Sequence, residues 1–165
     1  MRHVLVIGGA KDFRERLVSE LQALGFAAEA LWSGEGVLRR LTPTPPDGLV
    51  ISPDLPEMKI GALMNWIRGT SQAETIPVIA AVATRDEERE AQGTTCDHII
   101  RVSRWTSNLA NEVRIRFEAE WDRRNQARDQ QATKAQPQAA ELASRRQENG
   151  TPNPASPFVF FTIRL

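Results

Sequence analysis

The chain has 165 residues, 41% of them hydrophobic and 25% charged, a composition that predicts one soluble globular domain. Its 21 Lys and Arg residues balance 21 Asp and Glu residues, so no net field favours nucleic acid or an anionic membrane. A single cysteine excludes an internal disulfide, and no apolar run reaches the roughly 20 residues of a membrane span. We therefore expect a cytoplasmic protein without a cofactor, whose partners are proteins.

Hydrophobic periodicity predicts five strands with helices between them. The strands are short apolar runs without polar alternation, expected at residues 4–7, 27–31, 48–51, 76–83 and 98–102. Helices with apolar residues at helical spacing are expected at 12–24, 33–41, 58–68 and 105–121, and a short polar segment lies at 84–93. Short connections and right-handed crossovers then predict an α/β fold: a flavodoxin-like, five-stranded, doubly wound parallel sheet.

Two helices carry further signals. Asp12 and Glu15 are spaced as in a capping box, which predicts that Asp12 caps the first helix. In the last helix, large apolar residues recur every fourth position and predict a face that packs on the sheet. These residues are Trp105, Leu109, Val113, Phe117 and Trp121.

Beyond Trp121 the composition changes. Residues 1–121 are expected to form the α/β domain, and residues 122–150 are too polar to join its core. That segment is interpreted as a helical extension of the last helix or a linker. Residues 151–165 end in an aromatic tail with strand propensity, in which Phe158, Phe160 and Phe161 are candidate contact residues for a partner.

Ser52 is the first candidate for a functional site. It follows the predicted buried strand at 48–51, and Pro53 cannot continue the strand because it lacks a backbone N–H. Ligands of open parallel sheets bind at the carboxyl ends of the strands. The sequence therefore places Ser52 where chemistry is expected.

The five strands, together with the Leu-Pro-Glu-Met turn after the third, resemble the receiver domain of bacterial response regulators over about residues 1–121. Receivers carry an acidic pair for magnesium after the first strand and a phosphoaccepting aspartate at the end of the third. A Thr or Ser ends their fourth strand and a lysine their fifth. In this sequence the matching residues are Gly8, Gly9, Ser52, Val82 and Arg101. Each of the family's functional residues is therefore replaced by another residue type.

These replacements remove the chemistry that the resemblance implies. Two glycines offer magnesium no carboxylate, and a serine hydroxyl is a weak nucleophile that needs an adjacent base. Val82 cannot donate a hydrogen bond to a phosphoryl oxygen. Arg101 keeps a cation, which we expect to pair with Asp54 or Glu57. The residues predict a degenerate receiver, or pseudo-receiver, that is not an enzyme and has no catalytic or metal-binding residue.

The favoured interpretation is a phosphorylation-independent protein-interaction module in bacterial signalling or cellular organisation. Its partner would be a signalling kinase, a regulator or a scaffold, and a homodimer through the last strand and helix stays open. By resemblance, Arg104 and Trp105 lie on the face that receivers commonly use for output, although Trp105 suits the core equally well. Trp66 is out of step with the apolar face of its helix, so we expect it to be partly exposed.

Two alternatives remain. The first is a sensor of a small anion or nucleotide, in which Gly8, Gly9, Ser52 and Arg101 line the vacated pocket and hold the ligand through backbone amides and the guanidinium. The second is an active phosphoacceptor receiver that uses Ser52 or Asp54. Cys96 has no accompanying histidine motif, so we interpret it as a small buried residue.

Overall fold

The structure is a computed structural model, and it describes residues 1–41, 44–71, 73–103 and 108–148, with side chains as far as residue 133. Contacts divide the chain into two units, Met1–Asp122 and Arg123–Leu165. The strands are β1 (His3–Ile7), β2 (Ala27–Leu31), β3 (Gly48–Ile51), β4 (Val78–Val82) and β5 (His98–Arg101). The helices are α1 (Lys11–Ala23), α2 (Gly34–Leu41), α3 (Ile60–Gly69), α4 (Arg85–Gln92) and α5 (Leu109–Glu148).

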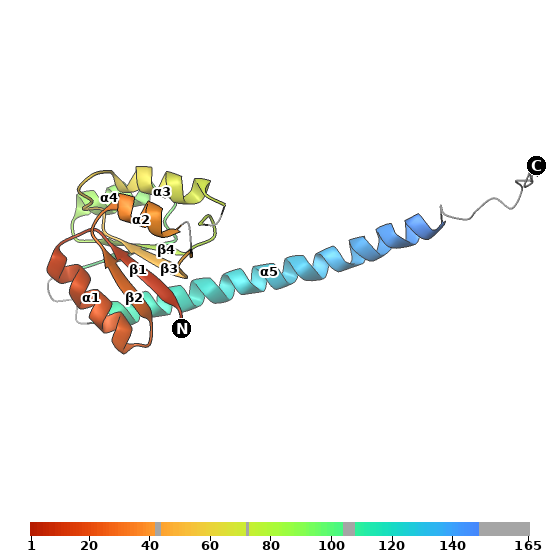
Figure 1. Ribbon diagram of the computed structural model, residues 1–165, viewed down its shortest axis with the longest axis horizontal. Helices are drawn as coiled ribbons and strands as arrows, with labels where there is room; N and C mark the ends of the chain where they lie inside the picture. The colour runs from red at the N-terminus through yellow and green to blue at the C-terminus, as the bar shows by residue number, and fades with distance from the viewer. Residues whose placement is uncertain (42–43, 72, 104–107, 149–165) are drawn as a thin grey trace, which may run out of the picture. The chain divides into compact units, whose positions relative to one another are not determined.

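The five strands form one parallel sheet in the order β2-β1-β3-β4-β5 (Figure 1). Alternate strand residues enter two separate cores. Leu5 and Ile51 pack with residues of α2, α3 and α4, whereas Val4 and Val50 pack with residues of α1 and α5. Because helices cover both faces, the strands need apolar side chains at successive positions. The predicted fold class is confirmed.

Helix α1 does not begin as predicted. Its N-cap is Ala10, which makes no side-chain capping hydrogen bond, and Asp12 lies within the first turn. The prediction that Asp12 caps this helix in a capping box is wrong. A carboxylate in the first turn is favoured by the free N–H groups and the helix dipole without being a cap, so the spacing alone was ambiguous.

A capping box is present at α4 instead. The Thr84 Oγ accepts a hydrogen bond of 3.2 Å from the backbone N–H of Glu87, and the Glu87 carboxylate accepts from the backbone N–H of Thr84 at 3.3 Å. The reciprocal bonds fix the start of this short polar helix. Strand β4 begins at Val78, later than predicted, because Pro77 has no N–H and Ile76 donates its own to the carbonyl of Ala73.

The apolar face of α5 is confirmed for the described residues. Leu109, Val113, Phe117 and Trp121 are all buried against the sheet. Trp105, the remaining member of the predicted series, lies outside the described residues. None of the described helices is long and apolar enough to cross a membrane.

Candidate functional site

The turn after β1 is formed by Gly8 and Gly9, with φ values of +74° and +71°. Residues with a Cβ rarely adopt this left-handed backbone conformation. The Gly8 N–H donates to the carbonyl of Leu31 at 3.1 Å, and the Gly9 N–H donates to the carbonyl of Asp54 at 2.8 Å. A Cβ on Gly8 would lie 2.7 Å from the carbonyl oxygen of Ser52. The backbone conformation and the packing therefore both require glycine at position 8.

Arg14 of α1 binds this turn. Its Nη1 donates to the carbonyl oxygen of Gly8 at 3.4 Å and also to that of Gly9. A guanidinium thus lies against the carbonyl groups of the glycine turn. A main-chain hydrogen bond from Gly9 to Asp54 therefore holds the β1–α1 turn to the β3–α3 loop, and the Arg14 guanidinium holds the same turn to α1.

Ser52 follows β3 and is only 8% exposed. Its backbone N–H donates to the carbonyl of Ile7 at 2.8 Å, which fixes the residue at the carboxyl edge of the sheet. Its side chain lines a pocket of about 470 Å³. The hydroxyl has no hydrogen bond to any residue that the structure describes. Ser52 is therefore a buried polar side chain that faces open volume.

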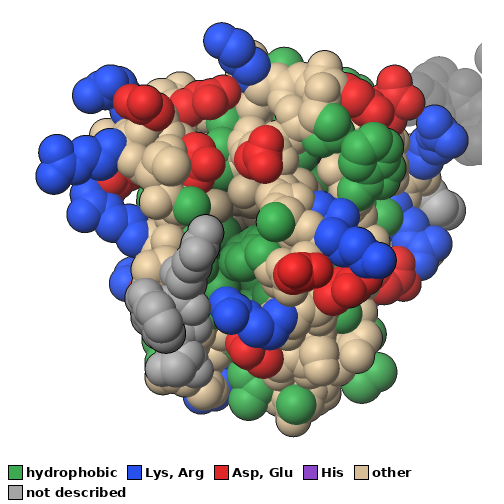
Figure 2. Space-filling model, turned by 90° about the vertical axis from the view of Figure 1, so that its left-hand side faces the viewer, with side chains coloured by type: hydrophobic (Ala, Val, Ile, Leu, Met, Phe, Trp, Pro, Cys, Tyr) green, Lys and Arg blue, Asp and Glu red, His purple; other side chains and the backbone are tan. Residues whose placement is uncertain are grey.

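This pocket, called here the carboxyl-edge pocket, combines apolar and acidic side chains. Its apolar side chains come from α1, β4 and the segments after β4 and β5: Phe13, Ala81, Ala83 and Val102. Its charged side chains are Asp12, Arg16, Asp54 and Glu87. The strands' carboxyl ends point toward the left of Figure 1, and the face seen from that side has a hydrophobic centre surrounded by charged side chains (Figure 2).

Val82 and Arg101 do not face the carboxyl-edge pocket. Both line a neighbouring hollow of about 390 Å³ beside α4. There the Arg101 Nε and Nη2 donate to the Glu88 Oε2 at 2.9 and 2.5 Å, and this hydrogen bonding raises the pKa of the guanidinium. Arg101 therefore pairs with Glu88, and the prediction that it pairs with Asp54 or Glu57 is wrong.

The positions carried over from the receiver resemblance are thus divided between two hollows. Four residues were expected to line a single anion pocket. Of these, Gly9 and Ser52 line the carboxyl-edge pocket, Gly8 is buried, and Arg101 lines the hollow beside α4. The physical reason is the alternation of side chains along a strand. Ala81 and Ala83 face α1, and Val82 between them enters the opposite core.

The candidate interaction residues are only partly described. Trp66 on α3 is 37% exposed, in agreement with its position off the apolar face of the helix. Arg104, Trp105, Phe158, Phe160 and Phe161 lie outside the described residues. Trp32, which follows the edge strand β2, is 61% exposed. Sequence reasoning missed this surface aromatic, although its position directly after a weak edge strand was a usable signal.

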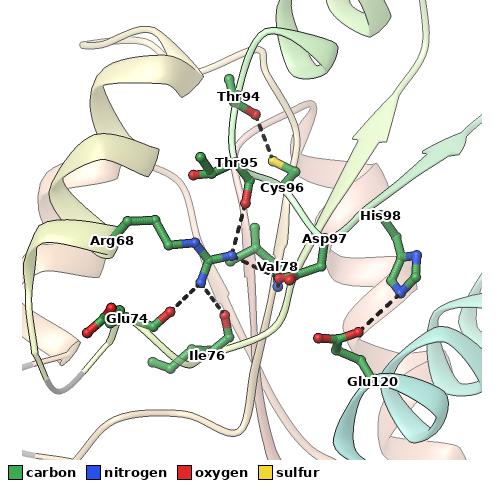
Figure 3. A network of polar contacts seen from close by, with 10 residues as sticks. All are labelled: Arg68, Glu74, Ile76, Val78, Thr94, Thr95, Cys96, Asp97, His98 and Glu120. Atoms are coloured by element: carbon green, nitrogen blue, oxygen red, sulfur yellow. Dashed lines mark hydrogen bonds and ion pairs between the residues drawn. The ribbon is translucent and has the colours of Figure 1, made fainter. Parts of the chain in front are cut away.

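A polar network joins the loops before β4 and β5 (Figure 3). The Arg68 Nη1 donates to the carbonyls of Glu74 and Ile76, each at 2.8 Å. Its Nη2 donates to the Thr95 carbonyl at 3.1 Å and to the Asp97 Oδ2 at 2.9 Å. All four acceptor residues precede these two strands, at the amino edge of the sheet, so the network supports the fold and not the carboxyl-edge pocket.

No protein-family model matches the sequence, and no curated protein matches it either. Solved structures do match. The fold is similar to the receiver domain of a signal transduction histidine kinase from Syntrophus aciditrophicus, with a TM-score of 0.63 and 24% identity over 72% of this chain and 92% of that chain. The chemotaxis response regulator CheY4 of Vibrio cholerae gives a TM-score of 0.63 and 17% identity over 71% and 98% of the two chains.

A third similar structure is the receiver domain of a sensor histidine kinase from Pseudomonas aeruginosa. Its TM-score is 0.64 at 13% identity, over 71% of this chain and 98% of that chain. That domain has a magnesium ion coordinated in its active site cleft. The present chain therefore has the receiver fold.

The residues present here do not fit a magnesium ion. Within the described part of the chain, no three His, Cys, Asp or Glu side chains are grouped to hold a metal ion. The turn after β1 carries two glycines, and its carbonyl groups already bind the guanidinium of Arg14. A hard dication requires several oxygen ligands, preferably carboxylates, and this turn offers it no carboxylate.

Proposed function

We propose that this receiver-fold protein is a pseudo-receiver, which works without aspartyl phosphorylation and binds another protein in bacterial signal transduction or cellular organisation. The Gly8-Gly9 turn carries the proposal. A side chain at Gly8 meets the Ser52 carbonyl, and both glycines have positive φ. An acidic pair at these positions therefore requires a rebuilt turn, and phosphoryl transfer without the metal lacks its main source of charge neutralisation.

The Ser52 environment supports the same proposal. A serine hydroxyl acts as a nucleophile only when a base removes its proton. None of the described side chains accepts a hydrogen bond from Ser52 Oγ, and no described histidine lines the carboxyl-edge pocket. Asp54 lines the pocket, but its carboxylate is exposed and lies beyond the strand end. Neither residue has the surroundings of a phosphoacceptor.

The partner in this proposal is a signalling kinase, a regulator or a scaffold, with a second copy of the chain as the other candidate. Balanced charge favours protein over nucleic acid. Trp32 and Trp66 expose aromatic surface, 61% and 37% respectively, and tryptophan is enriched at protein interfaces. For a homodimer, β5 and α5 are the proposed contact elements.

Incubation with acetyl phosphate and magnesium tests the first half of the proposal. Intact-mass spectrometry of the full chain is expected to detect no acid-labile phosphoryl adduct. A receiver domain with a complete acidic site, treated in parallel, is the control and becomes modified. An adduct on the full chain that is lost in Asp54→Asn or Ser52→Ala would make the protein an active receiver and refute the proposal.

Recovery of the tagged full chain from its native cells tests the second half. A stoichiometric protein partner is expected, with less recovered by Trp32→Ala or Trp66→Ala if these aromatic side chains contribute to the contact. Sedimentation of the purified chain identifies a homodimer directly. A chain that is recovered alone and sediments as a monomer would contradict a protein-binding function.

A further inference from the structure

We propose that the carboxyl-edge pocket binds an alkyl cation, meaning an ammonium or guanidinium group carried on an aliphatic chain. The group belongs either to a free alkylamine or to a lysine or arginine side chain of another protein. This site goes beyond the proposed function and does not depend on it. Three properties of the pocket carry the inference: its apolar wall, the charge of its lining and the unpartnered hydroxyl of Ser52.

The apolar wall fits an aliphatic chain. Phe13, Ala81, Ala83 and Val102 contribute to a pocket of about 470 Å³, within the range of roughly 300–1,000 Å³ typical of small-ligand sites. The two alanines keep the sheet side of the pocket open, since larger side chains there would occupy part of its volume. A methylene chain placed against these side chains is removed from water, and each buried CH₂ contributes about 0.8 kcal/mol of transfer free energy.

The charged lining selects a cation. The charged groups that line the pocket are three carboxylates, those of Asp12, Asp54 and Glu87, and one guanidinium, that of Arg16. Arg16 already forms an ion pair within α1, because its Nε lies 3.7 Å from Glu20 Oε1. The Arg14 guanidinium is bound to the glycine turn and does not line the pocket. An anion would therefore meet excess negative charge, and a cation would meet complementary charge.

Two of these carboxylates are available to a ligand. The Glu87 carboxylate accepts from the backbone N–H of Ala83 at 2.6 Å as part of the α4 cap. By contrast, the carboxylates of Asp12 and Asp54 have no ion pair or hydrogen bond with another residue in the described ranges. Both are exposed, so their ionised forms are solvated and can attract a positive group at a small desolvation penalty.

Ser52 is the independent observation that points to a ligand. The residue is only 8% exposed and lines the pocket, and its hydroxyl has no hydrogen-bond partner within the described chain. A ligand that displaces water from the pocket leaves this hydroxyl unpaired unless the ligand itself supplies a hydrogen-bond partner, and an unpaired buried hydroxyl is costly. An ammonium or guanidinium N–H can donate to Ser52 Oγ while its charge is balanced by Asp12 and Asp54.

Titration of the full chain with n-butylguanidinium and with butyrate tests the site. These probes share an alkyl chain and differ in charge. We expect n-butylguanidinium to raise the melting temperature and to shift the amide resonances of Gly9 and Ser52, and butyrate to do neither. Equal or stronger binding of butyrate, or no response to either probe at about 50 mM, would overturn the proposal.

Variants localise the binding. Asp54→Asn and Asp12→Asn should each weaken n-butylguanidinium binding about two- to fivefold, the effect of one exposed charge pair. Asp86→Asn is the matched control, because Asp86 is an exposed carboxylate on α4 that does not line the pocket. Ala83→Leu should weaken binding by narrowing the pocket, and urea unfolding checks that this variant folds. Unchanged affinity in both aspartate variants would contradict the proposal.

A short capped peptide containing one arginine distinguishes the two sources of the cation. Tighter binding of the peptide than of n-butylguanidinium indicates a protein side chain, and the reverse order indicates a free alkyl cation. Either result supports the site. The outcome is separable from the proposed function, because a chain that accepts phosphate from acetyl phosphate would contradict the pseudo-receiver proposal and leave this binding unaffected.

Discussion

Trp121 of α5 donates a hydrogen bond of 2.8 Å from its indole Nε1 to the backbone carbonyl of Asp47, a residue 74 positions earlier in the chain. The same indole ring stacks on Phe117 with a centroid distance of 5.3 Å. The guanidinium of Arg2 lies 3.8 Å from the ring centroid. Trp121 therefore joins the N-terminal segment, the loop before β3 and the last helix of the sheet unit.

Removing this contact should lower the free energy of unfolding. Trp121→Phe keeps an aromatic ring but leaves the Asp47 carbonyl without its donor, so we expect a loss of about 1–2 kcal/mol. Trp121→Ala also removes the stacked ring, with an expected loss of about 3–5 kcal/mol. Urea unfolding followed by far-UV circular dichroism measures both, because that signal does not depend on the tryptophan itself.

Trp66→Phe is the control for this pair of variants. Trp66 is 37% exposed on α3, and its replacement should change the unfolding free energy by less than about 0.5 kcal/mol. A Trp121→Phe protein as stable as the wild type would show that the indole hydrogen bond adds nothing measurable to the packing.

Gly8→Ala and Gly25→Ala separate steric clash from backbone strain. Both glycines have positive φ, +74° and +90°, but only at Gly8 would the new Cβ meet other atoms within 4 Å. Gly25→Ala should therefore cost about 1–2 kcal/mol, the penalty for a left-handed residue with a Cβ. Gly8→Ala should cost clearly more, because its Cβ also lies 2.7 Å from the Ser52 carbonyl oxygen. Equal losses in urea unfolding would mean that the turn relaxes freely.

The fold could be predicted because it depends on regular patterns. Leu109, Val113, Phe117 and Trp121 repeat at the helical period, and the repeat alone identifies the face that is buried. The strands lie between two helical layers, so unbroken apolar runs are sufficient to identify them. The start of α1 was harder, because Asp12 is equally favourable as a cap and as a residue of the first turn.

The site was less predictable, because it depends on which way each strand end faces. The sequence pattern predicted that Val82 and Arg101 lie at strand ends. It did not predict that both residues line the hollow beside α4, away from Ser52. The Glu88 partner of Arg101 comes from a helix 13 residues earlier, and no local spacing identifies it. The Arg68 network was missed for the same reason, since most of its acceptors are main-chain carbonyls that only folding brings together.

Arg68→Ala should be among the most destabilising substitutions of a partly exposed residue in this protein. The Arg68 and Asp97 side chains are only 20% and 14% exposed. Loss of the guanidinium removes the donor to three carbonyls and the cationic partner of the Asp97 carboxylate. We expect a loss of about 2–4 kcal/mol in the free energy of unfolding. Arg68→Lys should recover only part of it, because one ammonium cannot reach acceptors on both loops.

The Arg89→Ala variant provides the comparison. Arg89 also forms an ion pair, with Asp86, but the two side chains are 82% and 93% exposed, so its loss should cost less than about 0.5 kcal/mol. Hydrogen exchange adds a local measurement. The backbone N–H of Val78 donates to the Asp97 Oδ2 at 2.7 Å, and its exchange should accelerate in Arg68→Ala. Similar losses in Arg68→Ala and Arg89→Ala would rule out a special role for the network.

Cys96 should react slowly with thiol reagents in the folded protein. Burial raises the pKa of its thiol, against the opposing effects of the Thr94 hydrogen bond and the Arg68 charge, so little thiolate forms at pH 8. Labelling with a chromogenic disulfide should be about tenfold slower in the folded chain than in urea. As the pH rises above the ordinary thiol pKa, the unfolded chain loses its thiol proton first, so folding stability should fall, and Cys96→Ala should remove this part of the decrease. A native thiol that reacts as fast as the unfolded one would contradict the raised pKa.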